Sequence, residues 1–122
     1  MPVPRITKED LKSRLDGQDA TAIPTILDVR LKYPYEHSTI RLPGAIRMMA
    51  DAVDHTKLDR GRDVVVYDSD LNEVTGTAVA VELIRRGFKV SVLTGGVADW
   101  AGANLPVETK SAPKAAPPPA KA

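Results

Sequence analysis

Two carboxylates follow the most apolar stretch of the chain. Asp68 and Asp70 come directly after Val64–Tyr67. Asn72 and Glu73 complete the polar segment "DSDLNE". An aspartate after a buried strand can attack phosphate as a nucleophile, and a second carboxylate nearby can act as a general acid. Four oxygen-bearing side chains in one short turn can also bind a hard cation such as Ca²⁺ or Mg²⁺. The segment therefore allows a phosphatase site, a cation site or a solvated loop.

The phosphatase motif and the calcium-loop motif are each incomplete in this sequence. Four apolar residues followed by D-x-D resemble the opening of haloacid-dehalogenase-type phosphatases, which use an aspartate nucleophile and Mg²⁺. Those enzymes carry Thr or Val two residues after the second Asp, where this chain has Asn72. In a calcium loop that begins at Asp68, the twelfth position is Val79, which cannot ligate. We therefore expect no metal site, and we expect Asp70 and Glu73 to be solvated near a helix N-terminus.

Predicted strands and helices alternate around this segment. Short apolar runs predict strands within 25–30, 44–48, 63–67 and 89–96. Helical spacing and capping residues, such as Thr7 before the first helix and Gly17 after it, predict helices within 6–17, 75–86 and 97–106. Such alternation predicts a mostly parallel sheet with helices on both faces. Ligands bind such sheets at the carboxyl ends of the strands, where residues 28–30 and 68–72 both fall.

Three motifs in a fixed order carry a resemblance to a known family. They are the strand end "DVR", the turn "PGAI" and the closing segment "LTGGVADWAGANLPVE". From Thr25 to Glu108 the chain resembles the rhodanese domain. The resemblance implies a single α/β domain with a central, mostly parallel five-stranded sheet and helices on both faces.

The segment after the apolar strand resembles one branch of that family. The active-site loop of this branch opens with C-x-C-P-N-E. Placed on that pattern, Asp68 and Asp70 stand at the two cysteine positions and Leu71 at the proline. Asn72 and Glu73 match the pattern directly. The chain therefore looks like a degenerate member of the branch, with Asp68 in place of the active-site cysteine.

The resemblance also implies where a site lies and what it lacks. Asp28 and Arg30 are implied as pocket-lining residues. The implied active-site loop comprises Asp68, Ser69, Asp70, Leu71, Asn72, Glu73, Val74 and Thr75. The family transfers sulfur through a persulfide on the first cysteine, whose thiolate lies in a ring of loop N–H groups. Because the chain has no cysteine, we expect no catalytic residue. We expect the Asp68 carboxylate to supply an anion in that ring instead.

Three functions follow from these residues. The first is a catalytically inactive rhodanese-like domain that acts as a binding or regulatory module. The second is a sulfurtransferase whose cysteines at positions 68 and 70 have been replaced by aspartate, and the third is the haloacid-dehalogenase-type phosphatase. For the first we expect no cofactor and, as partner, an unknown protein or a small anionic ligand.

Composition sets the broad class. The chain has 122 residues and no signal-peptide or membrane-spanning apolar run, so we expect one cytoplasmic, monomeric domain. Residues 109–122 hold three lysines and no acid, and their Ala, Pro and Lys content predicts a disordered tail. Residues 1–108, the predicted domain, carry 14 basic and 16 acidic side chains, a net charge of −2. That balance argues against nucleic-acid binding.

Trp100, His37 and His55 are each expected to have a structural role or a place at the surface. Trp100 is expected in the core, with its indole N–H bonded locally. His37 and His55 have no acid or cysteine at ligand spacing, so we expect them at the surface and not as a metal pair.

Overall fold

A five-stranded parallel sheet forms the centre of the molecule, in the strand order β1-β6-β5-β2-β4. The computed structural model describes residues 3–17, 23–69 and 74–109. The strands of this sheet are β1 (Arg5–Ile6), β2 (Thr25–Asp28), β4 (Ile46–Arg47), β5 (Val64–Tyr67) and β6 (Val90–Leu93). Beside it, β3 (Ile40–Arg41) pairs antiparallel with β7 (Glu108–Thr109). The predicted parallel α/β fold is confirmed.

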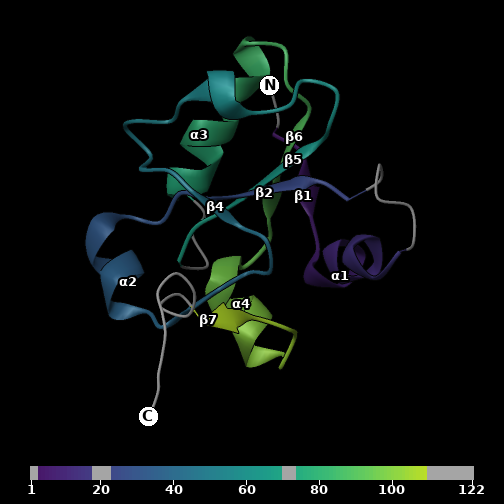
Figure 1. Cartoon of the computed structure of the whole chain (residues 1–122), viewed down its shortest axis with the longest axis vertical. Helices are drawn as coiled ribbons and strands as arrows, with labels where there is room; N and C mark the ends of the chain where they lie inside the picture. The colour runs from purple at the N-terminus through teal and green to yellow at the C-terminus, as the bar shows by residue number, and fades with distance from the viewer. Residues whose placement is uncertain (1–2, 18–22, 70–73, 110–122) are drawn as a thin grey trace.

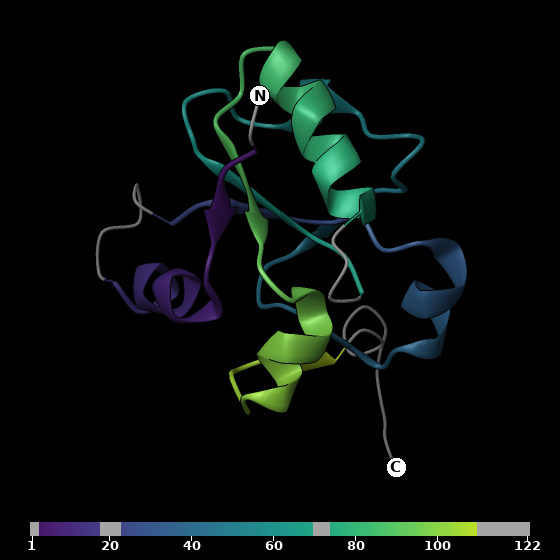
Figure 2. The same cartoon turned by 180° about the vertical axis from the view of Figure 1, so that it is seen from behind.

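Helices cover both faces of the sheet. They are α1 (Lys8–Asp16), α2 (Lys32–His37), α3 (Val74–Arg85) and α4 (Gly96–Gly102), with one turn of 3₁₀ helix, η2 (His55–Lys57). Figures 1 and 2 show α3 on one side of the sheet, with α1 and α4 on the other. None of the helices in the described ranges has the length and apolar content needed to cross a membrane.

The side chains of β5 separate the core into two layers. Val64 and Val66 join the cluster that packs under α3, whereas Val65 and Tyr67 join the cluster under α1 and α4. This division follows from the strand backbone, because successive side chains point to opposite faces of a sheet. All four side chains are buried, so β5 is the central strand that its apolar sequence predicted.

Local signals set the helix ends as expected. The Thr7 side chain accepts a hydrogen bond from the backbone N–H of Asp10 and caps the start of α1, and Gly17 ends that helix. Gly87, at a φ of 95°, lies just past α3 and lets the chain turn back into β6. The predicted helix over 75–86 is therefore confirmed within one residue at each end.

Several short elements were missed. Helix α2 contains Pro34 and buries none of its side chains. Its sequence therefore shows no apolar stripe from which a helix could be predicted. Strands β1, β3 and β7 span two residues each, which is too short for a periodic pattern. Strand β7 ends at Thr109, so the tail predicted over 109–122 begins inside it, and the rest of that tail lies outside the described residues.

Trp100 lies where the sequence predicts. Its side chain is fully buried in the cluster under α1 and α4. The indole Nε1 donates a hydrogen bond to the carbonyl oxygen of Pro106 at 2.7 Å. The indole N–H is thus hydrogen-bonded locally, and the Trp100 side chain packs α4 onto the core.

Candidate functional site

Asp68 lies at the carboxyl end of β5 and is 3% exposed. Its Oδ2 accepts a hydrogen bond of 2.9 Å from the backbone N–H of Gly76, in the first turn of α3. Its carbonyl oxygen accepts a second bond, of 3.0 Å, from the N–H of Val97 in α4. The residue at the predicted cysteine position therefore joins β5 to two helices, and its carboxylate faces the positive end of α3.

Gly76 allows this close approach. A Cβ on Gly76 would lie 3.3 Å from Asp68 Oδ2 and 3.5 Å from the Val92 side chain. A backbone without a side chain can thus come within hydrogen-bonding distance of a buried anion, as in many anion sites at helix starts. Gly76 lies inside the helix predicted over 75–86, but no role was predicted for it.

The predicted active-site loop is described only in part. Ser69 and Thr75 are partly buried, while Val74 is 71% exposed. Asp70, Leu71, Asn72 and Glu73 lie outside the described residues. The eight-residue site over 68–75 therefore stays a prediction, and Asp68, Ser69, Val74 and Thr75 are its described residues.

Asp28 and Arg30 form a buried ion pair at the carboxyl end of β2, and each is 1% exposed. Arg30 Nη2 donates to Asp28 Oδ2 at 2.7 Å, and Nε donates to Oδ1 at 3.1 Å. The backbone N–H of Arg30 also donates to Oδ1, at 3.1 Å. Burial opposes the charged guanidinium, but the hydrogen bonds and charge of Asp28 outweigh it and raise the pKa of Arg30.

Tyr67 completes the pair from the neighbouring strand. Its hydroxyl donates to Asp28 Oδ2 at 2.9 Å and accepts from the backbone N–H of Leu42 at 3.3 Å. Burial and the negative charge of Asp28 raise the pKa of Tyr67, so the phenol remains protonated. Tyr67 was not predicted as a site residue, although a tyrosine that ends an apolar strand must find a partner for its hydroxyl.

Arg47 and Tyr35 cover this cluster from outside. The Arg47 guanidinium lies 4.0 Å from the centre of the Tyr35 ring, close enough for a cation–π interaction. Arg47 Nη1 donates to the carbonyl oxygen of Arg30 at 2.6 Å and lies 3.6 Å from Asp28 Oδ1. Neither Arg47 nor Tyr35 was predicted. The cluster thus places two arginines around one aspartate.

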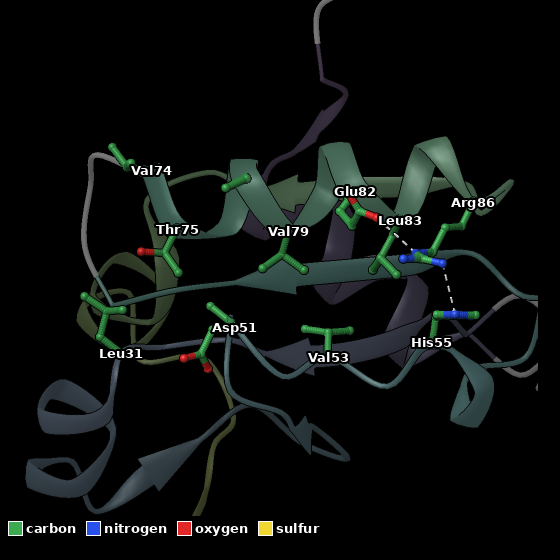
Figure 3. A pocket seen from close by; sticks show the side chains of 12 residues that line it. Leu31, Asp51, Val53, His55, Val74, Thr75, Val79, Glu82, Leu83 and Arg86 are labelled. Carbon is green, nitrogen blue, oxygen red and sulfur yellow. Dashed lines mark hydrogen bonds and ion pairs between the residues drawn. The ribbon is translucent and has the colours of Figure 1, made fainter.

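A surface groove runs along α3 and includes Val74 and Thr75, the last two residues of the predicted loop. Its volume is about 570 Å³, within the range of small-molecule sites. We call it the α3 groove, and Figure 3 shows the 12 residues that line it. They are Leu31, Ala50, Asp51, Val53, His55, Val74, Thr75, Ala78, Val79, Glu82, Leu83 and Arg86.

The predicted pocket residues and the groove are distinct in this structure. Asp28 and Arg30 do not line the α3 groove, and they form a buried ion pair with each other. A role for them in a ligand pocket stays a prediction. Within residues 3–17, 23–69 and 74–109, no group of three or more His, Asp or Glu side chains is arranged to hold a metal ion.

Comparisons with known proteins agree with this fold. The Rhodanese-like domain family matches residues 7–103. The rhodanese-like domain of an Anabaena protein, solved in solution, shares 31% identity over 97% of this chain and 89% of its own, with a TM-score of 0.68. A full-length Lactobacillus plantarum protein shares 30% identity over 86% of this chain and 87% of its own, with a TM-score of 0.73.

A more distant structure shares the fold alone. A Rhodopseudomonas palustris protein, described as a possible tyrosine phosphatase, shares 17% identity over 87% of this chain and 85% of its own, with a TM-score of 0.71. A search of curated proteins found no match.

Proposed function

Because this chain belongs to the rhodanese-like domain family, we propose that it is a member that binds a ligand or partner without transferring sulfur. The proposal rests mainly on one observation. The buried carboxylate of Asp68, at the end of the central strand, accepts the N–H of Gly76 at the start of α3. The resemblance to the C-x-C-P-N-E branch implies that other members hold a thiolate at this position.

A thiolate and a carboxylate differ in the one step that sulfur transfer requires, which is bond formation to sulfur. A thiolate sulfur accepts a sulfane sulfur by forming an S–S bond, which gives a persulfide. A carboxylate oxygen can take up the same hydrogen bond but forms no such bond with sulfur. Since the chain contains no cysteine, no other residue can serve as the sulfur acceptor. Asp68 therefore supports a domain that keeps the family's fold and its buried anion but not its reaction.

Sulfur transfer can be tested directly. Purified protein is incubated with thiosulfate and cyanide, and thiocyanate is measured against a buffer blank. We expect no thiocyanate above the blank, because no thiolate is present to carry the sulfur. Thiocyanate formed in proportion to the amount of protein would contradict the proposal.

An Asp68→Cys variant tests the alternative that aspartates replaced the family's cysteines. If the N–H of Gly76 still stabilises an anion in that variant, its thiol should have a lowered pKa. The thiolate should then attack the outer sulfur of thiosulfate, form a persulfide and release sulfite. Mass spectrometry would detect the added sulfur atom. A persulfide on this variant would support a sulfurtransferase origin, whereas an unreactive thiol would count against it.

A further inference from the structure

The α3 groove has an apolar body and two polar ends. One wall is α3, and the other is the segment between β4 and η2. Val53 and Val79 approach each other across it, as Figure 3 shows. Along α3 the lining runs from Val74 to Arg86, which corresponds to a length of about 18 Å at the rise of an α-helix. An elongated apolar ligand therefore fits this groove better than a compact one.

One end of the groove is closed by paired polar side chains. Arg86 Nε donates to Glu82 Oε2 at 3.0 Å, and Arg86 Nη1 lies 3.2 Å from His55 Nε2. This second contact joins α3 to η2 across the groove (Figure 3). The charges of Glu82 and Arg86 offset each other, so this end attracts neither anions nor cations strongly.

The other end is open and apolar at its rim. Leu31 and Val74 line it and are 56% and 71% exposed. Exposed aliphatic side chains at the mouth of a cavity favour an apolar ligand. Asp51 and Thr75 lie toward the same end in Figure 3, and Asp51 is exposed. This open end thus combines apolar contact with one carboxylate.

The charge at the open end is negative. The start of α3 would favour an anion through its partial positive charge of about half a unit. The carboxylate of Asp68 already occupies that helix start, with Oδ2 on the Gly76 N–H, so the helix start is not free for the anionic group of a ligand. Among the lining residues, Glu82 forms an ion pair with Arg86, so Asp51 is the acid whose charge is not offset in this way. The open end therefore disfavours anionic ligands and favours cations.

We propose that the α3 groove binds an elongated aliphatic molecule that carries an ammonium group at one end. The aliphatic chain lies along Val53, Val79 and Leu83, and the ammonium lies at the open end near Asp51. This inference rests on the proposed binding role and specifies its ligand. It replaces the small anionic ligand expected from the sequence with one of opposite charge.

Three probes of equal chain length test the charge preference. Octylamine, octanol and octanoate are titrated separately below their aggregation concentrations, and backbone amide shifts are followed by NMR. We expect shifts at groove residues, with octylamine binding tighter than octanol by about twofold to fivefold, the value of an exposed ion pair. Octanoate should bind more weakly than octanol. Octanoate binding as tightly as octylamine would overturn the proposal.

Substitutions of residues that line the α3 groove test whether the probes bind there. Asp51→Asn should remove the preference for octylamine over octanol while leaving octanol binding unchanged. Ala78→Trp places a large ring in the groove and should weaken all three probes by at least about fivefold, as expected when buried apolar contact is lost. Ala98→Trp changes another exposed alanine, on α4, and should bind as the parent does. Equal affinity in the Ala78→Trp and Ala98→Trp variants would contradict the proposal.

The sulfur-transfer assay separates this inference from the proposed function. A protein that forms no thiocyanate but fails to bind octylamine would overturn the inference and leave the proposed function intact. A protein that forms thiocyanate would overturn the proposed function, whatever the groove binds.

Discussion

Asp28 accepts hydrogen bonds from two neighbouring parts of the fold. Arg30 binds both of its carboxylate oxygens, and Tyr67 donates to Oδ2 from the next strand. A buried carboxylate costs free energy unless its oxygens are hydrogen-bonded and its charge is paired. The cluster meets both conditions, and it ties the ends of β2 and β5 together beside Asp68.

Removing the Tyr67 hydroxyl should destabilise the domain. Tyr67→Phe leaves Asp28 Oδ2 without one donor and the N–H of Leu42 without its acceptor. We expect a loss of about 1 to 3 kcal/mol in the free energy of unfolding by urea, the cost of unsatisfied buried polar groups. Tyr33→Phe, at a side chain that is 67% exposed, is the control and should change stability by less than about 0.5 kcal/mol. Equal losses in both variants would contradict this role.

Tyr67 also gives the protein an alkaline dependence of stability. Its pKa is raised by burial in the folded state, whereas in the unfolded chain it is about 10. The stability that this tyrosine contributes is therefore complete below about pH 10 and is lost as pH rises further, because the unfolded form then releases a proton. Urea unfolding at about pH 9 and about pH 11 should show a smaller decrease for Tyr67→Phe than for the parent. An identical decrease would contradict the assigned shift.

The sequence predicted some of these residues and not others. Asp68, Asp28 and Arg30 were found because each follows an apolar run, where parallel strands present their carboxyl ends. Arg47 and Tyr35 lie in contact with that cluster but follow no such run. Their contact joins a side chain of α2 to a side chain of β4, and a single sequence carries no periodic signal for it.

At the scale of elements, β6 and α4 are joined by a glycine turn. Gly95 and Gly96 have φ angles of 82° and 62°, in the left-handed region that favours glycine. A Cβ on Gly95 would lie 2.5 Å from the Cβ of Asp99, whose N–H donates to the Gly95 carbonyl. The turn therefore sets where α4 begins, and with it the N–H of Val97 that binds Asp68.

Gly95→Ala should disrupt this turn. A non-glycine residue at positive φ costs about 1 to 3 kcal/mol, and the close approach to Asp99 adds to that. We expect a loss of at least this size in urea unfolding. Gly102→Ala, in the last turn of the same helix, meets no atom within 4 Å and should be neutral or stabilising by up to about 1 kcal/mol. A Gly95→Ala protein as stable as Gly102→Ala would show that the turn tolerates a side chain.

Element prediction succeeded where a pattern was long or buried. The strand over 64–67 and the helix over 74–85 have continuous or periodic apolar residues, and both were predicted. Helix α2 has no buried side chain, and its sequence contains a proline. It forms in a connection between strands, so tertiary context decides it more than local preference.

At the scale of the whole molecule, the two faces of the sheet differ. The face under α1 and α4 is closed by Leu11 and Trp100, both fully buried. The face under α3 also packs a continuous core, but the outer edge of that helix carries the α3 groove. Binding along that edge would leave the core unchanged, so we expect the domain to hold a ligand without large rearrangement.

The segment after β7 should be dispensable for this fold. Deleting residues 110–122 keeps the pairing of β7 with β3 and the ion pair between Arg41 and Glu108. The deleted residues are rich in Ala, Pro and Lys and have little apolar surface to bury. We expect the Tm to change by less than about 2 °C. A decrease of several degrees, measured by circular dichroism, would mean that this segment packs against the domain.

The central claim is that Asp68 supplies a stable buried anion where the family holds a thiolate. Replacing Asp68 by Asn keeps the size of the side chain but removes its charge. We expect Asp68→Asn to lower the free energy of unfolding in urea at pH 7 by about 1 to 3 kcal/mol, as for hydrogen bonds to a charged group. Asp51→Asn, at an exposed carboxylate, is the matched control and should change it by less than about 0.5 kcal/mol. An Asp68→Asn protein as stable as the parent would contradict the claim.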